Sequence, residues 1–152
     1  GRGAQAEPAV LHLVRREMWA QLSEHLLPEL QGVEPAVRAH FQKVTESLDG
    51  IEGVRRLETP EVDRYLRHLV FRKQLVIHPT LLSNLCLLDF LPTFLALYGQ
   101  GFARHRGREM QDQDYWDALD VAEKFLVYHC RGLRPVYQRC ARFLVDQLRS
   151  PL

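Results

Sequence analysis

The sequence predicts an all-α domain, a compact bundle of six or seven helices around one central apolar helix. The first observation is the stretch TLLSNLCLLDFLPTFLALY at 80–98, which is apolar on nearly every side of a helical wheel. Such a pattern is typical of a helix buried in a bundle or in a membrane. The second is that the flanking segments carry apolar residues at three- and four-residue spacing, so each has one face to bury. The third is that no segment has a convincing strand pattern.

We interpret residues 1–152 as a single helical domain, with residues 1–7 frayed at its start. A length of 152 residues is enough to bury a sizeable core. Apolar residues make up 46% and charged residues 26%, which is typical of a globular protein. The net charge is +1, so no overall basic field favours nucleic acid or an anionic membrane.

Proline, glycine and capping residues mark where the helices begin and end. Thr59-Pro60-Glu61 is a strong start signal, because a hydroxyl cap, a proline and an acid follow one another. Pro135 opens the last helix, and Gly132 is placed for a C-terminal cap before it. We expect a first helix that begins at Pro8, kinks or stops near Pro28 and is closed by Gln31-Gly32. Further helices are expected at about 35–48, 60–77 and 79–103, then from a cap at Asp112 or Asp114 to about 131, and at 135–149.

The central helix, about 79–103, contains Pro92, which removes a backbone hydrogen bond. We therefore expect a kink near Pro92 or two short helices, about 79–90 and 92–103. We expect no membrane span, although the stretch is nearly long enough. An acid in mid-span, such as Asp89, costs roughly 2.5–3.5 kcal/mol on insertion scales.

Burial of Asp89 requires a partner, because an unpaired buried charge is costly. Two alternatives stay open: exposure at the helix end near Pro92, or a buried pair with an arginine of another helix, for instance Arg72 or Arg142. The apolar stripes of the helices are expected to bury, among others, Val70, Leu85, Leu88, Trp116 and Leu148.

No motif for catalysis, metal binding or nucleotide binding is present. The chain lacks CxxC, HExxH, GxSxG, GxGxxG and the P-loop pattern, so we expect no cofactor, no metal and no enzyme. The acids at 112–120 are explained by the helix dipole rather than by calcium. The three cysteines, Cys86, Cys130 and Cys140, lie in apolar surroundings, which favours buried thiols in an intracellular protein, cytoplasmic or nuclear.

Two basic clusters remain. One comprises Arg64, Arg67, His68, Arg72 and Lys73, and the other Arg104, His105, Arg106 and Arg108. If consecutive helices are antiparallel, Arg64, Arg67, Arg104 and Arg106 form one patch that meets an acidic partner segment through forked guanidinium pairs. The competing account holds these arginines within the domain, on Glu58, Glu61, Asp63 or Glu109.

The leading functional hypothesis is a non-catalytic scaffold or adaptor domain that binds a peptide or partner subunit through an apolar groove with an arginine-rich rim. Trp19 and Phe71 lie off the apolar stripes of their helices, and interface cores favour aromatic residues and arginine. Self-association is compatible with the same features. The expected partner-binding residues are Arg64, Arg67, His68, Phe71, Arg104, His105, Arg106, Arg108 and Trp19.

The alternative hypothesis is a helical nucleic-acid-binding domain that uses the Arg64/Arg67 and Arg104–Arg108 clusters. Stacking aromatics are not interleaved with these clusters, which argues against it. The layout of a central apolar helix wrapped by amphipathic ones resembles the Bcl-2 architecture in topology alone. The Asn-Trp-Gly-Arg stretch is absent, so the resemblance implies nothing about function.

Overall fold

The computed structural model describes residues 9–29, 35–46, 57–71, 80–128 and 131–149, and these segments are helical apart from short connections. The helices are α1 (Ala9–Glu29), α2 (Pro35–Glu46), α3 (Pro60–Phe71), α4 (Leu81–His105), α5 (Asp112–Val121), the π-helix η3 (Ala122–Tyr128), the 3-10 turn η4 (Arg131–Leu133) and α6 (Arg134–Arg149). No strand occurs in the described segments. The predicted all-α bundle is confirmed. The part of the expected third helix after Phe71 lies outside the described residues.

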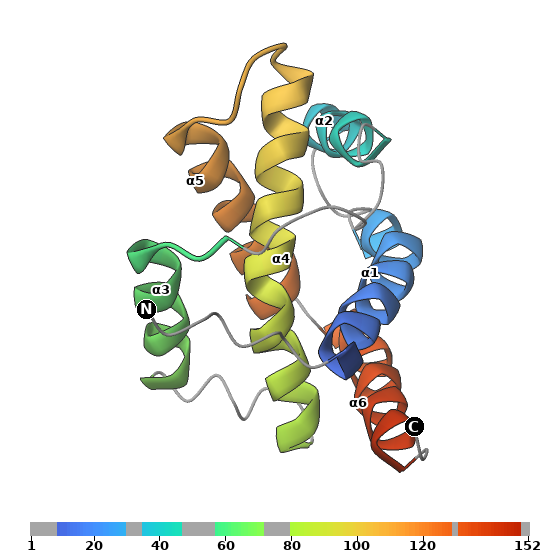
Figure 1. Cartoon of the computed structure of the whole chain (residues 1–152). Coiled ribbons are helices and arrows are strands. Elements are labelled where there is room, and N and C mark those ends of the chain that lie inside the picture. The colour runs from blue at the N-terminus through green and yellow to red at the C-terminus, as the bar shows by residue number, and fades with distance from the viewer. Residues whose placement is uncertain (1–8, 30–34, 47–56, 72–79, 129–130, 150–152) are drawn as a thin grey trace.

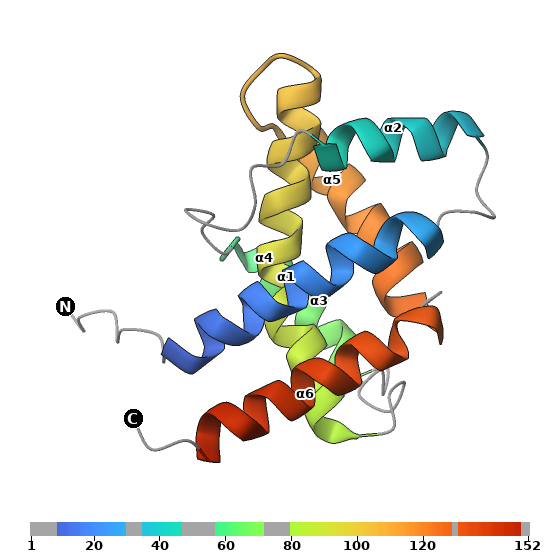
Figure 2. The same ribbon diagram turned by 90° about the vertical axis from the view of Figure 1, so that its right-hand side faces the viewer.

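α4 is the central element of the bundle (Figure 1). α3 and α5 lie on one side of it, and α1, α2 and α6 lie on the other. A quarter turn shows α1 and α6 running antiparallel, side by side, across α4, with α2 against the C-terminal end of α4 (Figure 2). Every other α-helix can therefore bury its apolar face against α4 or a neighbour of α4.

The second half of α4 forms the core. Every residue from Phe90 to Gly99 is buried. Aromatic rings at four-residue spacing line one face, with centroids 6.2 Å apart from Phe90 to Phe94, 4.5 Å from Phe94 to Tyr98 and 6.4 Å from Tyr98 to Phe102. Each such pair adds about 0.5–1.5 kcal/mol beyond the burial of its area. The apolar residues on all sides of this half of α4 are therefore buried.

The first half of α4 is buried on one side only. Cys86 and Leu87 face the core, whereas Leu81 and Leu85 are exposed and Leu88 is half-buried. The expectation that Leu85 is buried is wrong, because the described helices cover this half of α4 from one direction. The expectation is also wrong for Val70, Trp116 and Leu148, all of which are exposed.

Pro92 does not divide the central helix. α4 is one helix of 25 residues that contains Pro92, so the alternative of two short helices is wrong. The carbonyl of Pro92 accepts a hydrogen bond of 3.2 Å from the backbone N–H of Leu57, which holds the segment before α3 against α4. At the start of the helix, Thr80 Oγ1 accepts from the Ser83 backbone N–H at 3.1 Å. α3 is capped in the same way, by Thr59 Oγ1 accepting from the Val62 N–H at 3.3 Å.

Asp89 forms a two-point ion pair with an arginine of another helix. Arg15 of α1 donates from Nε to Oδ2 at 2.8 Å and from Nη2 to Oδ1 at 2.9 Å. The Arg15 side chain is only 4% exposed and that of Asp89 is 23% exposed. The paired alternative is confirmed, with Arg15 as a partner. Of the two arginines suggested from the sequence, Arg142 forms no ion pair with Asp89 in the described segments, and Arg72 lies outside them. The pair joins α1 to α4.

α4 is long and apolar enough in composition to cross a membrane. Of its most apolar 18-residue window, however, 72% is buried inside the bundle. The core helix of a bundle meets the same criteria of length and composition.

Candidate functional site

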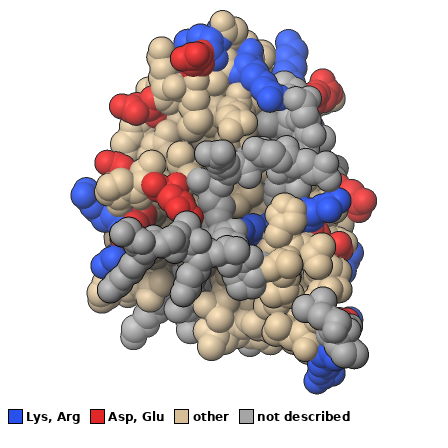
Figure 3. Space-filling model, in the orientation of Figure 1, with Lys and Arg blue, Asp and Glu red and all other residues tan. Residues whose placement is uncertain are grey.

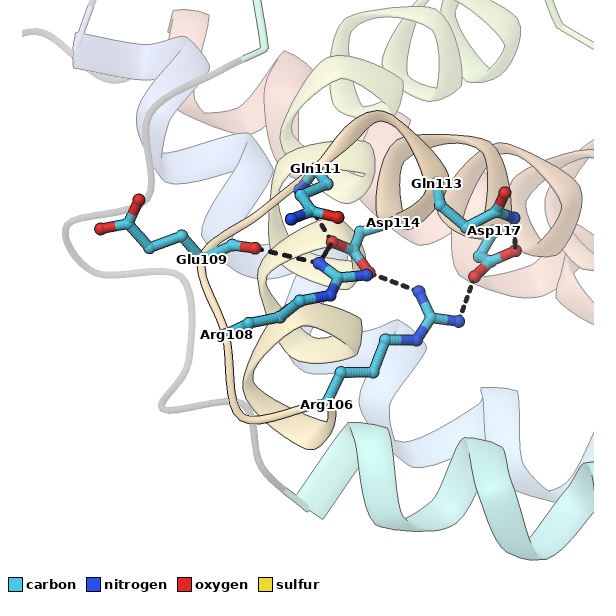
Figure 4. Close-up of polar contacts among 7 residues, drawn as sticks. All are labelled: Arg106, Arg108, Glu109, Gln111, Gln113, Asp114 and Asp117. Atoms are coloured by element: carbon cyan, nitrogen blue, oxygen red, sulfur yellow. Dashed lines mark hydrogen bonds and ion pairs between the residues drawn. The ribbon is translucent and has the colours of Figure 1, made fainter.

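The basic cluster after α4 turns back onto acids at the start of α5 (Figure 4). Arg106 donates from Nη1 to Asp114 Oδ1 and from Nη2 to Asp117 Oδ2. Arg108 donates from Nη1 to Asp114 Oδ2 and from Nη2 to Asp114 Oδ1, the latter at 3.0 Å. A third donor, the Gln111 backbone N–H, lies 2.8 Å from Asp114 Oδ2. The cap position of α5 is occupied by Gln111 rather than by Asp112 or Asp114, which were expected from the sequence.

Asp114 is the centre of this network. Its side chain is fully buried. Burial raises the pKa of the carboxyl, but hydrogen bonds from Arg108, the Gln111 N–H and Arg106 outweigh burial and lower that pKa from 3.8 to about 2. The two arginines and two aspartates sum to zero charge, so this cluster offers little net charge to a partner. Neither acid was among the internal partners that the sequence suggested.

His105, which belongs to the same basic cluster, takes part in the contact between α2 and α4. Its ring lies 5.0 Å from the ring of His40, and His40 stacks on Phe102 at 5.3 Å. Burial, then the nearby charges of His105 and Arg106, lower the pKa of His40 below 6.5. Arg104 is exposed beside this contact.

The basic residues of α3 lie elsewhere. Arg67 pairs with Asp63 one turn away, Nε to Oδ2 at 2.9 Å, and both side chains are exposed. Arg64 and His68 line a hollow between α3 and α5. Phe71, at the end of α3, is 85% exposed.

The structure does not bring the two basic clusters together. α3 lies beside the lower part of α4, whereas Arg106 follows the opposite, upper end of α4 (Figures 1 and 2). On the face shown in Figure 3, basic and acidic side chains are interspersed and no continuous basic field is visible. The expected single patch of Arg64, Arg67, Arg104 and Arg106 is therefore not formed.

A groove between α3 and α5 is the most distinctive hollow on the described surface. Two adjoining cavities form it, of about 430 and 270 Å³, and they share Glu61, Tyr115 and Trp116. Two stripes at helical spacing line it: Glu61, Arg64, Tyr65 and His68 on α3, and Asp112, Tyr115, Trp116 and Leu119 on α5. The first turns of both helices line the cavity at one end of the groove, and later residues of both helices line the other cavity, so α3 and α5 run in the same direction along the groove.

Trp116 is the residue that the sequence reasoning missed. We expected it in the core, yet it is 53% exposed. Its ring meets that of Tyr115 edge-on, with centroids 5.0 Å apart. Trp19, which we expected at a partner surface, is instead half-buried against the core. An apolar stripe shows which side of a helix faces the rest of the domain. It does not show whether neighbouring helices cover every residue of that stripe.

A second hollow, of about 640 Å³, lies between the start of α4 and α6. Among the described residues that line it, the charged ones are Arg142, Arg149 and Asp146, and none is aromatic. Mixed charges without an aromatic wall make it a weaker candidate than the groove between α3 and α5.

The cysteine thiols and the metal-ligating side chains of the described residues bear on whether the chain has a catalytic or metal site. Burial, and after it the charge of Asp89, raises the pKa of the Cys86 thiol to about 11. Burial, together with smaller effects from Cys86 and Glu17, raises that of Cys140 to about 12. Neither cysteine is therefore a reactive thiolate at neutral pH. No group of three or more metal-ligating side chains is found among the described residues, and Cys130 lies outside them.

No protein-family model, curated protein or solved structure matches the chain. The candidate function therefore depends on the groove and its chemistry.

Proposed function

We propose that the chain is a non-catalytic protein-interaction domain, a scaffold or adaptor module, that binds a short peptide segment of a partner in the groove between α3 and α5. The observation that carries the proposal is Trp116, a large aromatic side chain left 53% exposed in a groove. Tyr115, Tyr65 and Leu119 line the groove around it. Trp, Tyr and Arg are the residue types that dominate binding energy at interfaces.

The exposed aromatic surface is large enough to drive binding. An aromatic side chain buries about 150–250 Å² when covered, so covering the exposed half of Trp116 removes about 100 Å² from water. At about 25 cal/mol per Å², that contributes about 2–3 kcal/mol. A short peptide that also covers Tyr115 and Leu119 reaches micromolar affinity only with polar contacts in addition, since about 8 kcal/mol is needed.

The position of Arg64 favours a partner peptide with an acidic residue. Arg64 lines the groove on α3, one turn after Glu61. No ion pair within the described segments involves Arg64. Arginine pairs with a carboxylate through two parallel hydrogen bonds. His68 lies beside it on the same stripe. A peptide with an apolar residue followed by Asp or Glu fits this end of the groove.

The remaining features agree with a binding module. The two cysteines with raised pKa values, Cys86 and Cys140, are free and buried, which supports absence of thiol catalysis and an intracellular location. Arg106 and Arg108 give their guanidinium groups to Asp114 and Asp117. That pairing removes the main support for the nucleic-acid alternative, which needs arginines directed at phosphates.

A peptide library displayed on phage tests the proposal. The library is selected on the wild-type domain and counter-selected on Trp116→Ala. We expect enriched peptides with an apolar residue next to Asp or Glu, which bind Trp116→Ala at least tenfold more weakly.

The matched control is Leu148→Ala, which removes an exposed apolar side chain on α6, away from the groove. Its affinity for the selected peptides should equal that of the wild type. Circular dichroism checks that each variant is folded. If no peptide distinguishes the wild type from Trp116→Ala, the proposal is wrong.

A further inference from the structure

We propose that the wide end of the groove, at the first turns of α3 and α5, is a pocket for a basic side chain, an arginine or lysine of the bound peptide. This inference rests on the proposed function and adds the chemistry of a second contact. The pocket is the cavity of about 430 Å³, and among the described residues that line it Glu61 and Asp112 are the charged ones. Tyr115 and Trp116 supply aromatic walls, and Met110 supplies an adaptable apolar one.

The two carboxylates are not neutralised by the described part of the chain. No hydrogen bond or ion pair involves the side chain of Glu61 or Asp112 within those residues. Glu61 lies close enough to Tyr115 for its charge to matter. Burial is the first cause, and the charge of Glu61 the second, of a raised pKa for the Tyr115 hydroxyl.

The helix dipoles do not cancel this negative charge. Glu61 and Asp112 lie in the first turns of α3 and α5, where each helix start carries roughly half a positive charge. Two starts offset about one of the two negative charges, which leaves the described lining of the pocket negative by about one. The neighbouring Arg106 and Arg108 are already matched by Asp114 and Asp117.

The walls suit a cation with an apolar stem. A guanidinium or ammonium group is attracted to the face of an indole or phenol ring. Arginine and lysine also place their methylene stems along apolar surface while the charge points to a carboxylate. The edge-on arrangement of Tyr115 and Trp116, with ring planes 66° apart, presents two differently oriented rings to such a side chain.

The opposite end of the groove carries the opposite charge, and this sets the direction of the peptide. Glu61 and His68 are seven residues apart on α3, which is about 10 Å along a helix. A peptide that places its basic residue at Glu61 and Asp112, and its acidic residue at Arg64 and His68, satisfies both ends. The reversed peptide puts like charges together at both ends.

The test uses two small probes, N-acetyl-arginine amide and N-acetyl-citrulline amide, the second being neutral and of nearly the same shape. Binding is followed by the NMR signal of the Trp116 indole N–H, which is assigned with Trp19→Phe. We expect saturable shifts with the arginine probe, and at least tenfold weaker binding of the citrulline probe. The double variant Glu61→Gln with Asp112→Asn should weaken the arginine probe at least tenfold.

A charge-matched control is Asp120→Asn with Asp146→Asn, two exposed acids outside the pocket, and it should bind the arginine probe as the wild type does. Equal binding of the two probes, or unchanged binding to the Glu61/Asp112 variant, overturns the inference. Phage-selected peptides that need Trp116 but not Glu61 and Asp112 overturn it as well, while the proposed function survives. If the arginine probe binds but no peptide depends on Trp116, the cation pocket survives and the proposed function fails.

Discussion

Arginines near the upper end of α4 and arginines on α3 form equally basic clusters in the sequence, yet the fold uses them differently. Arg106 and Arg108 are bound to the buried Asp114 and close the turn between α4 and α5. Arg64 lines the groove between α3 and α5 and pairs with no acid of the described segments. The acids that the fold brings near, rather than the density of basic residues, therefore decide which arginines remain for a partner.

Arg15 is a buried arginine that pairs with Asp89. Removing the carboxylate of Asp89 should have the largest effect on the free energy of unfolding. Asp89→Ala leaves a guanidinium group that is only 4% exposed without its carboxylate. We expect a loss of about 3 kcal/mol in the free energy of unfolding, measured by urea denaturation. The control Asp120→Ala breaks the exposed pair with Lys124 and should cost less than about 0.5 kcal/mol. A loss below about 1 kcal/mol for Asp89→Ala would contradict the structural role of the pair.

Asp114→Asn tests the cluster at the end of α4. Asparagine keeps the shape and an acceptor for the Gln111 N–H but loses the negative charge between Arg106 and Arg108. Since both arginine side chains are 30% exposed, water compensates part of the loss. We expect about 2 kcal/mol lower stability. Asp117→Asn, which touches only Arg106 of the two arginines, serves as a milder comparison, and a larger effect there would reverse the assigned roles.

Acid should remove the same contribution without any mutation. The pKa of Asp114 is about 2 in the folded chain against an ordinary 3.8, so the unfolded chain takes up the proton first. The stabilisation is present above about pH 4 and is lost as the pH falls toward about 2. Unfolding curves of the wild type and Asp114→Asn between pH 6 and pH 2 should converge at the acid end. A gap that stays constant over this range would mean that the charge of Asp114 is not what stabilises the turn.

Features that depend on neighbouring residues in the sequence were predictable. The start of α3 at Pro60 follows from Thr59 and the acid after it, and the central position of α4 follows from its apolar composition. The pairing of Asp89 with an arginine of another helix was one of the two alternatives that the sequence left open, because a buried charge must be matched whereas an exposed one need not be. The helix bounds differ by about two residues at α4, which local signals do not determine better.

Features that depend on tertiary contacts were not predictable. A proline costs about 3 kcal/mol inside a helix, yet α4 continues through Pro92 because the ten residues around it are buried on all sides. Trp116 has the spacing of a core residue, and only the position of α3 leaves it open. The pairing of Arg106 and Arg108 with Asp114 had only a weak signal in the sequence. A short polar turn between two helices brings the charged residues before and after it close together.

A comparison of Arg64→Ala with Arg106→Ala, in both stability and affinity for a phage-selected peptide, separates an arginine that binds the partner from one that stabilises the fold. Arg64→Ala should change the free energy of unfolding by less than about 0.5 kcal/mol and weaken peptide binding about tenfold, which corresponds to about 1.4 kcal/mol. Arg106→Ala should lower stability by about 1–2 kcal/mol and leave the affinity of the folded domain unchanged. If Arg106→Ala weakens binding and Arg64→Ala does not, the groove between α3 and α5 is not the binding site.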